Sequence, residues 1–219
     1  MKRAVFVLAL TISGCAFTDI PVTLPVQPTG NLRGGEGRQI VIVAPLSDER
    51  QYRDKCGIQK NAYSMETAKA ICSMDPAIWV AQRLTAELKT AGFTVASQGA
   101  AKPSALQLTG SLLKIFVEPV IGFSTISLET DIHVKLVATT GTGLLAERHF
   151  FVKGVESGLV AHAGNFQTSV DRAADTVMRD MVAAIISLMN RYPELGLRAP
   201  GRGSARIALA RKEQLWHVY

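Results

Sequence analysis

The chain has 219 residues, of which 24 are basic and 18 are acidic, so its formal net charge is +6. Seven of the basic residues lie at the two ends: Lys2, Arg3, Arg198, Arg202, Arg206, Arg211 and Lys212. The remaining body is close to neutral and has no basic stripe interleaved with aromatic residues, which argues against a nucleic-acid partner. The length of the chain predicts one medium-sized domain with tails.

The first fourteen residues have the order of a secretory signal peptide. Lys2 and Arg3 supply a positive start, residues 4–13 are apolar, and Ser13 and Gly14 are small residues before Cys15. About 20 apolar residues are needed to cross a bilayer, so this run is too short to remain as a membrane span. We expect residues 1–14 to be removed. Two alternatives remain: an ordinary secretory signal in which Cys15 is incidental, or a buried N-terminal strand.

The tetrapeptide Ile12-Ser13-Gly14-Cys15 resembles the lipobox of bacterial lipoproteins. The resemblance implies that the Cys15 thiol receives a diacylglyceryl group and becomes the new N-terminus, facing the periplasm. Each acyl methylene buried in a bilayer contributes about 0.8 kcal/mol, so two or three chains such as palmitate would hold the protein there. Ala16 follows the cysteine, where an Asp would resemble an inner-membrane retention signal, so the outer membrane is expected.

Two cysteines remain once Cys15 is taken by lipid, namely Cys56 and Cys72. The periplasm oxidises such pairs. A bridge between them would close a loop of about 15 residues and stabilise the fold by roughly 3 kcal/mol. A metal or redox pair is the alternative, but neither CxxC spacing nor a flanking His is present. The sequence therefore predicts a structural disulfide, with no metal and no cofactor.

The segment after Cys15 predicts a spacer. Residues 16–38 contain three prolines and four glycines without a periodic apolar pattern. We expect residues 15–38 to form the lipidated cysteine and a flexible tether, residues 39–192 a single periplasmic domain, and residues 193–219 a basic tail. An extended strand packed on the body is the alternative for residues 22–26.

The first core element is a strand over residues 39–45, continuous in β-branched residues and closed by Pro45. A polar stretch up to Ser73 follows, with a short helix expected over residues 64–71. Asp75 as N-cap and Pro76 at the first helical position begin a helix that Gly92 ends. The apolar residues at helical spacing, which are expected to be buried, are Ile78, Ala81, Leu84, Leu88 and Ala91.

The second half of the chain predicts strands and a final helix. We expect strands over residues 93–97, 105–118, 124–138 and 144–155, the last two joined by a turn over residues 140–143. Residues 124–138 alternate between apolar and polar, as in a strand with one solvated face. Apolar residues at helical spacing continue to about Asn190. The fold class is therefore α/β (α+β): a two-layer sandwich with a mostly antiparallel sheet and two main helices on one face.

Three features together resemble the YajG-type lipoproteins. They are the lipobox, the run Val-Ala-Pro-Leu-Ser-Asp-Glu-Arg at residues 43–50, and the helix that closes on Ala-Gly-Phe-Thr-Val at residues 91–95. More distantly, the chain is similar to auxiliary lipoproteins of envelope ABC-type lipid transport systems. The resemblance spans roughly residues 1–192 and implies a location in the cell envelope more firmly than an activity.

Three groups of polar residues are candidate sites. Asp48, Glu49, Arg50 and Arg53 follow the first strand, where α/β proteins often bind ligands, although a charged turn with local ion pairs is the commoner explanation for such a run. His133 and His149 could meet across two strands, but exposed histidines are usually only solvated.

The basic tail is the third group. It is expected to be disordered, or else to dock on anionic lipid or an acidic partner through the residues Arg198, Arg202, Arg206, Arg211, Lys212, Trp216 and Tyr219.

Two functions follow from these expectations, neither of them enzymatic, because no catalytic set of residues is recognisable. The first is an envelope scaffold or accessory subunit that binds another protein, which predicts a filled core with an exposed patch or edge strand. The second is a carrier for lipid or another apolar ligand, which predicts a continuous apolar cavity of several hundred Å³ between helices and sheet. The oligomeric state is left open.

Overall fold

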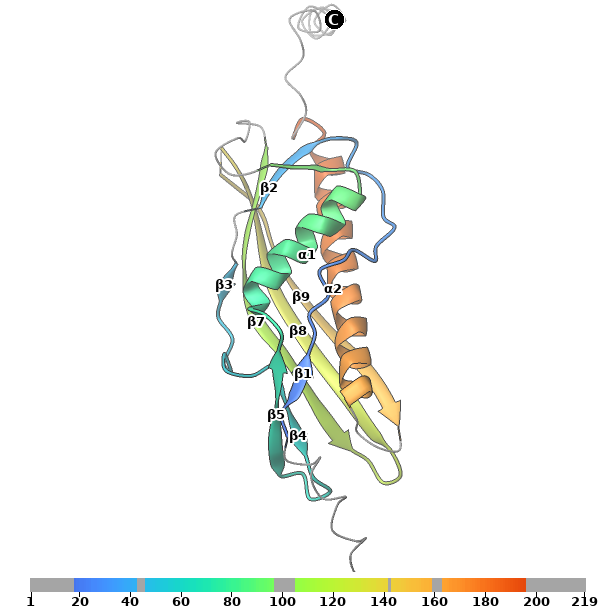
Figure 1. The fold of residues 1–219 in the computed structure, drawn as a ribbon. Coiled ribbons are helices and arrows are strands. Elements are labelled where there is room, and N and C mark those ends of the chain that lie inside the picture. The colour runs from blue at the N-terminus through green and yellow to red at the C-terminus, as the bar shows by residue number, and fades with distance from the viewer. Residues whose placement is uncertain (1–17, 43–45, 97–104, 142, 159–162, 196–219) are drawn as a thin grey trace, which may run out of the picture.

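The computed structural model describes residues 18–42, 46–96, 105–141, 143–158 and 163–195. Three long antiparallel strands form the main sheet: β7 (Leu106–Ile121), β8 (Ile126–Thr140) and β9 (Gly143–Gly158). Their pairing runs along almost their whole length, apart from register shifts near Leu112 and Ala138. Figure 1 shows them as the long twisted ribbon behind the helices.

The other edge of β7 pairs with three short strands in succession, all of them parallel to it. These are β2 (Gln39–Ile42), β3 (Ser47–Asp48) and β4 (Gly57–Lys60). Strand β6 (Thr94–Ala96) lies parallel to β2. Strand β5 (Glu66–Cys72) runs antiparallel to β4, and β1 (Ile20–Val22) lies parallel to β5. One long strand therefore organises two smaller strand groups at opposite ends of the domain.

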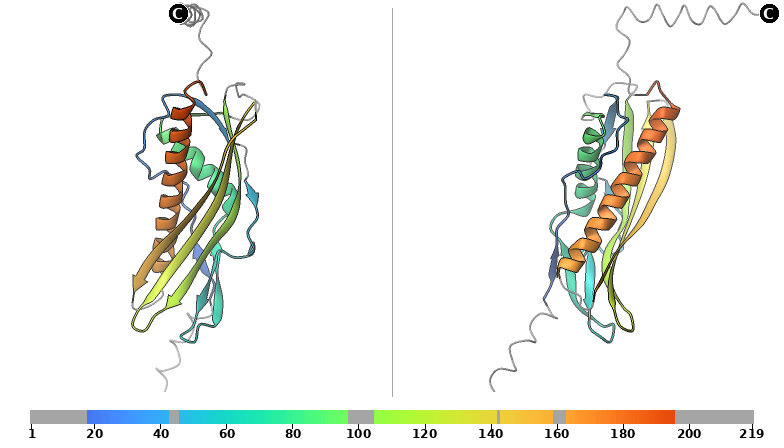
Figure 2. Two further views of the ribbon diagram at one scale, coloured as in Figure 1. Left: turned by 180° about the vertical axis from the view of Figure 1, so that it is seen from behind. Right: turned by 90° about the vertical axis from the view of Figure 1, so that its right-hand side faces the viewer.

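Two helices cover one face of this sheet (Figure 2). Helix α1 (Pro76–Thr90) begins as the sequence predicts, because the Asp75 carboxylate accepts hydrogen bonds from the amides of Ala77 and Ile78. Helix α2 (Ala163–Arg191) lies along β8 and β9. The predicted two-layer α/β sandwich with both helices on one face is confirmed.

The core lies between the helices and alternate residues of the long strands. On β8, Leu128, Ile132 and Val134 are buried together with Thr130, whereas Glu129, Asp131 and His133 are partly exposed on the outer face of the sheet. Gly154 on β9 allows α2 to approach closely, because a Cβ there would lie 2.2 Å from the carbonyl oxygen of Ser169. The predicted alternation is thus the division between the core and the solvated face.

Two local expectations were wrong. The expected helix over residues 64–71 is instead strand β5, in which buried Ala68 and Ala70 alternate with partly exposed neighbours. Ile78 is 40% exposed, whereas the adjacent Trp79 is fully buried. Helix α1 is covered on a second side, so the buried part of its surface differs from the single apolar face that the spacing predicted.

That second side is covered by the segment expected to be a flexible tether, and this is the main correction. From Ile20 onward the segment belongs to the domain: β1 adds to the sheet, and Val22 and Leu24 lie in the core. The Trp79 indole donates a hydrogen bond of 2.8 Å to the carbonyl of Pro25. The prolines and glycines of this segment suit an extended strap that packs closely on the helices, so a proline- and glycine-rich composition did not mean that the segment is flexible.

A buried polar network fixes this strap, which comprises residues 23–38. The Arg83 guanidinium, fully buried on α1, bonds to Glu87 at 3.0 Å, to Asp175 on α2 at 2.9 Å and to the Pro25 carbonyl at 3.0 Å. Glu87 also accepts the Gly30 amide, at 3.0 Å. Because a buried charge is costly unless it is paired and hydrogen-bonded, this network requires the strap to be in place.

The C-terminal boundary also differs slightly from the expectation, because Leu195 is buried, beyond the predicted end at residue 192. Within the described ranges, no helix combines the length and the apolar character that a membrane span requires.

Candidate functional site

The predicted disulfide is present. Cys56, just before β4, and Cys72, at the end of β5, are bonded, with their Cα atoms 5.6 Å apart. The bridge joins two adjacent antiparallel strands, and it closes the loop that sequence spacing indicated. Cys15 and the tail residues from Arg198 to Tyr219 lie outside the described residues.

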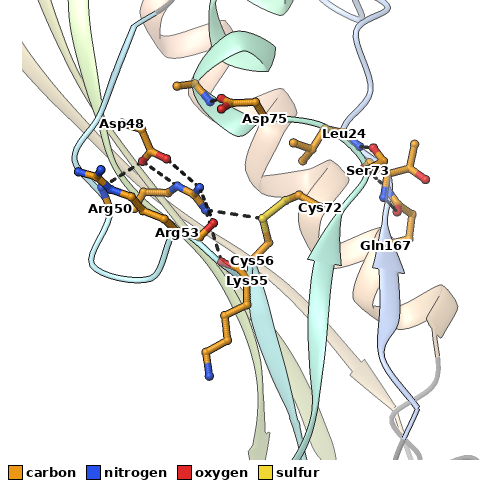
Figure 3. Close-up of a disulfide and its surroundings, with 12 residues drawn as sticks. Leu24, Asp48, Arg50, Arg53, Lys55, Cys56, Cys72, Ser73, Asp75 and Gln167 are labelled. Atoms are coloured by element: carbon orange, nitrogen blue, oxygen red, sulfur yellow. Dashed lines mark hydrogen bonds and ion pairs between the residues drawn. A yellow bond between two sulfur atoms is a disulfide. The ribbon is translucent and has the colours of Figure 1, made fainter.

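The Asp48, Glu49, Arg50 and Arg53 cluster separates into a buried part and an exposed part. Arg50 is buried and holds the Asp48 carboxylate through two bonds, Nε to Oδ1 and Nη2 to Oδ2, each of 2.9 Å. Its Nη1 also approaches the Cys56 sulfur at 3.8 Å (Figure 3). Partial burial alone would raise the pKa of Asp48, but the hydrogen bonds and charge of Arg50 outweigh it and hold that pKa below its ordinary value.

The geometry gives this cluster a structural use. Arg50 connects the loop over residues 48–56 to the disulfide. It also donates to the backbone carbonyl of Arg53 at 3.4 Å. The Glu49 carboxylate accepts hydrogen bonds from Ser111 at 2.6 Å and from Ser47 at 2.9 Å, and these bonds lower its pKa. The charged-turn interpretation therefore describes Asp48 and Arg50, while Arg53 remains exposed to solvent.

The outer face of β7, β8 and β9, away from the helices, is the second candidate surface. His133 and His149 meet there, with Nε2 of the first 3.0 Å from Nδ1 of the second. Burial, and then the charge of His149, lower the pKa of His133. Phe151 contacts the His133 ring edge-on and is 59% exposed. In the part of the chain that the structure describes, no three His, Cys, Asp or Glu side chains are arranged to hold a metal ion.

Apolar and charged groups alternate across this outer face. Phe151 and Val155 on β9 are exposed, and Tyr52 packs against Phe116 with ring centroids 5.4 Å apart. The charged side chains around them form ion pairs between neighbouring strands: Lys114–Asp131, Lys135–Glu147 and Lys153–Glu129. Sequence reasoning found the histidines but not Phe151, although its place on the same face of a predicted strand as the polar residues His149 and Lys153, two positions to either side, was a usable signal.

Strand β9 is also an edge. Within the described residues β9 pairs with β8 alone. An edge strand carries backbone groups that can pair with another chain.

Among the described residues, the cavity between helix and sheet is smaller than a carrier needs, and the two larger hollows, of about 370 and 600 Å³, lie elsewhere: one beside Tyr52 and Phe116, and one, widely open to solvent, beside His149 and Asp180. A cavity of about 110 Å³ lies between the sheet and the C-terminal half of α2. Its lining includes Leu108, Leu136 and Leu188 together with the side chains of Arg148 and Arg191. Ligand pockets generally measure about 300–1,000 Å³, so this space suits a few water molecules or a short apolar group better than a lipid.

Comparison with known proteins shows the fold and no family. No protein-family model matches the chain. No curated protein is significantly similar to it. A solved structure of protein XCC0632 from Xanthomonas campestris, of the DUF330 family, is similar with a TM-score of 0.55 and 12% identity, over 81% of this chain and 99% of that one. A hemagglutinin homolog from Helicobacter pylori has a TM-score of 0.36 and 10% identity, over 75% and 91% of the two chains. The chain therefore has the fold of the DUF330 protein across nearly the whole domain.

Proposed function

We propose that this protein is a lipoprotein of the bacterial cell envelope, held by lipid on Cys15 to the outer membrane and facing the periplasm. Its domain acts as a non-enzymatic scaffold or accessory subunit of an envelope assembly. The observation that carries the proposal is the pairing of Cys56 with Cys72. It uses two of the three cysteines in a bond typical of exported proteins and leaves Cys15, within the lipobox-like sequence, for modification.

The form of the domain supports binding rather than carriage. A scaffold needs an exposed patch or an unpaired edge, and β9 offers both, since it carries Phe151 and Val155 along an edge strand. A partner that adds a strand to β9, or packs on the outer face, would find apolar anchors between polar neighbours. The small interior cavity favours this function over the carrier.

The anchor is tested by expressing the full-length protein beside a Cys15→Ala variant and determining the mass of the mature N-terminus. Cleavage before Cys15 and an added diacylglyceryl and acyl mass are expected, and the variant should leave the outer-membrane fraction. A mature N-terminus elsewhere, or an unmodified Cys15, would refute the anchor.

The scaffold is tested with a photo-crosslinking amino acid at position 151, in living cells. We expect it to capture a defined envelope protein, identified by mass spectrometry. The same group at Gln82, exposed on the opposite layer, is the matched control. Lipid co-purifying in stoichiometric amount without any captured protein would favour the carrier instead.

A further inference from the structure

One end of the domain carries apolar side chains that nothing in the described fold covers. The turn between β4 and β5, residues 61–65, exposes Tyr63 (83%) and Met65 (57%). The turn between β7 and β8, residues 122–125, exposes Phe123 completely, and Val120 beside it is half exposed. Tyrosine and phenylalanine at the tips of turns expose much more apolar surface than loops need, so a contact at this end is expected.

The two turns lie side by side. Strand β4 is parallel to β7, with Gly57 opposite Val117, and the Lys60 ammonium pairs with the Glu118 carboxylate at 2.5 Å just before both turns. All three views place the two turns at the same end of the domain, the lower end in Figure 1 (Figure 2).

Both tips have a defined conformation. The Asn61 side chain accepts the amides of Tyr63 and Met65 at 2.9 and 3.1 Å, and the Gly122 amide donates to the Thr125 carbonyl at 2.9 Å. The exposed side chains therefore project from ordered turns.

The chain enters the fold at this same end. Strand β1 begins at Ile20 beside β5, and the side-chain amide of Gln59 donates to the Thr18 carbonyl at 3.2 Å. Ile20 lies only five positions after Cys15, and five chain steps at full extension span about 17 Å. A lipid on Cys15 would therefore hold the two turns close to the bilayer surface.

The charged side chains near the two turns form ion pairs with one another. Besides Lys60 and Glu118, Lys55 pairs with Glu66 at 2.7 Å, and Lys69 pairs with Asp54 at 2.6 Å. Attraction to anionic lipid would need unpaired cations, and the described residues at this end do not concentrate them. Aromatic side chains, by contrast, are enriched where a bilayer meets water, because their rings suit the headgroup region.

We propose that the β4–β5 and β7–β8 turns insert Tyr63, Met65 and Phe123 into the interface of the same bilayer that the Cys15 lipid anchors. The inference rests on the lipid anchor of the proposed function. It adds an orientation: the long axis of the domain stands on the membrane, and the end that carries the β8–β9 turn and the C-terminus of α2 points away from it (Figure 1).

The test uses the full-length lipidated protein in vesicles of phosphatidylethanolamine and phosphatidylglycerol with brominated acyl chains, which quench nearby indoles. Trp216→Phe removes one native indole, and buried Trp79 remains as a constant background. In the Trp216→Phe protein, the indole introduced by Phe123→Trp should emit at shorter wavelength. The brominated lipid should quench about half of the emission that this indole adds. Leu144→Trp is the control: this position is 65% exposed and belongs to the β8–β9 strand pair at the opposite end, so its added emission should fall by less than about a tenth.

A second lipid composition separates insertion from charge attraction. In zwitterionic phosphatidylcholine vesicles with the same bromination, quenching of the Phe123→Trp protein should be unchanged. Quenching that disappears there, or that salt abolishes, would overturn apolar insertion. An indole at position 123 that is shifted to the blue yet insensitive to bromine would show that protein, either a second copy or a partner, covers the tips, and would also overturn it.

The same samples distinguish this inference from the proposed function. Protein that carries the lipid mass and floats with the vesicles, but shows equal quenching at positions 123 and 144, keeps its anchor and loses the insertion. Protein whose Cys15 is unmodified and that does not float removes both.

Discussion

Two buried or half-buried polar groups are energetically distinctive in this domain, Arg83 beneath the strap and His133 on the outer face. Arg83 is fully buried, and its partners come from α1, α2 and the strap. His133 shares a hydrogen bond with a second imidazole and has a lowered pKa. Arg83 should affect the stability of the fold through its buried ion pairs, and His133 should make that stability depend on pH.

Replacing Arg83 with Leu should lower the free energy of unfolding by about 3–5 kcal/mol. The substitution would leave the nearly buried Glu87 carboxylate without its cation and would also release the Pro25 carbonyl. Urea unfolding measures the loss. Arg179→Ala, which removes an exposed pair with Asp180, is the control and should cost no more than about 1 kcal/mol. Equal losses for the two variants would mean that the network does not stabilise the strap.

The stability of the fold should fall as the pH is lowered from 7.5 toward 5.5, in part because of His133. Its pKa in the folded protein lies below the ordinary 6.5, so the unfolded chain binds more protons in this window. The contribution is fully present above pH 6.5 and is lost as the pH falls through the folded pKa. Thermal unfolding at several pH values should show a smaller slope for His133→Gln. An unchanged slope would exclude His133 as its source.

The elements of the domain differ in how they are held. Helix α1 contacts the sheet on one side and the strap on another, and β4 and β5 are joined to each other by the disulfide. Arg38 at the end of the strap donates to the Met189 carbonyl at 2.7 Å, near the C-terminus of α2, where a positive charge is favourable. The strap therefore connects both helices, and a change within it should be felt by the whole domain.

A methyl group at Gly35 should destabilise the protein by about 1–3 kcal/mol. Its Cβ would lie 2.3 Å from the backbone of Gly92 and Phe93, where the strap crosses the end of α1. Chemical unfolding of Gly35→Ala measures the effect. Asn31→Ala, at an exposed strap position, should stay within about 0.5 kcal/mol of the parent. A neutral Gly35→Ala would mean that residues 23–38 are free of the helices after all.

Removing the disulfide by Cys56→Ala and Cys72→Ala together should lower stability by roughly 3 kcal/mol, since the bridge spans 16 residues. The urea midpoint of the wild type should fall to that of the double variant when a reductant is added. The midpoint of the variant should not respond to reductant. A wild type unaffected by reduction, together with a stable double variant, would contradict a structural role for this bond.

The molecule as a whole has one continuous core, to which the strap, both helices and the sheet all contribute. Unfolding should therefore be a single cooperative transition. Fluorescence of Trp79, which reports on the contact between α1 and the strap, and far-ultraviolet circular dichroism should give the same urea midpoint in a Trp216→Phe background. Two separated midpoints would show that the strap or the β4–β5 hairpin unfolds independently.

Periodicity and end signals in the sequence were sufficient for the long elements. The alternation in residues 124–138 predicted β8 and its solvated face, and Asp75-Pro76 predicted the start of α1, because these depend on neighbours only a few residues away. The pairing of Cys56 with Cys72 followed from counting cysteines. The fold class could be predicted from these signals together.

The packing of the strap and the apolar end of the domain depend on contacts between residues far apart in the sequence. Nothing within residues 20–38 indicates that Pro25 and Gly30 meet Arg83 and Glu87, more than fifty positions away, and a proline- and glycine-rich strap has the composition of a linker. Likewise, the turns that carry Tyr63 and Phe123 are far apart in the chain and become neighbours because β4 pairs with β7. Local sequence encodes an element through its own backbone and periodicity, whereas the strap and the apolar end exist only where distant segments pack together.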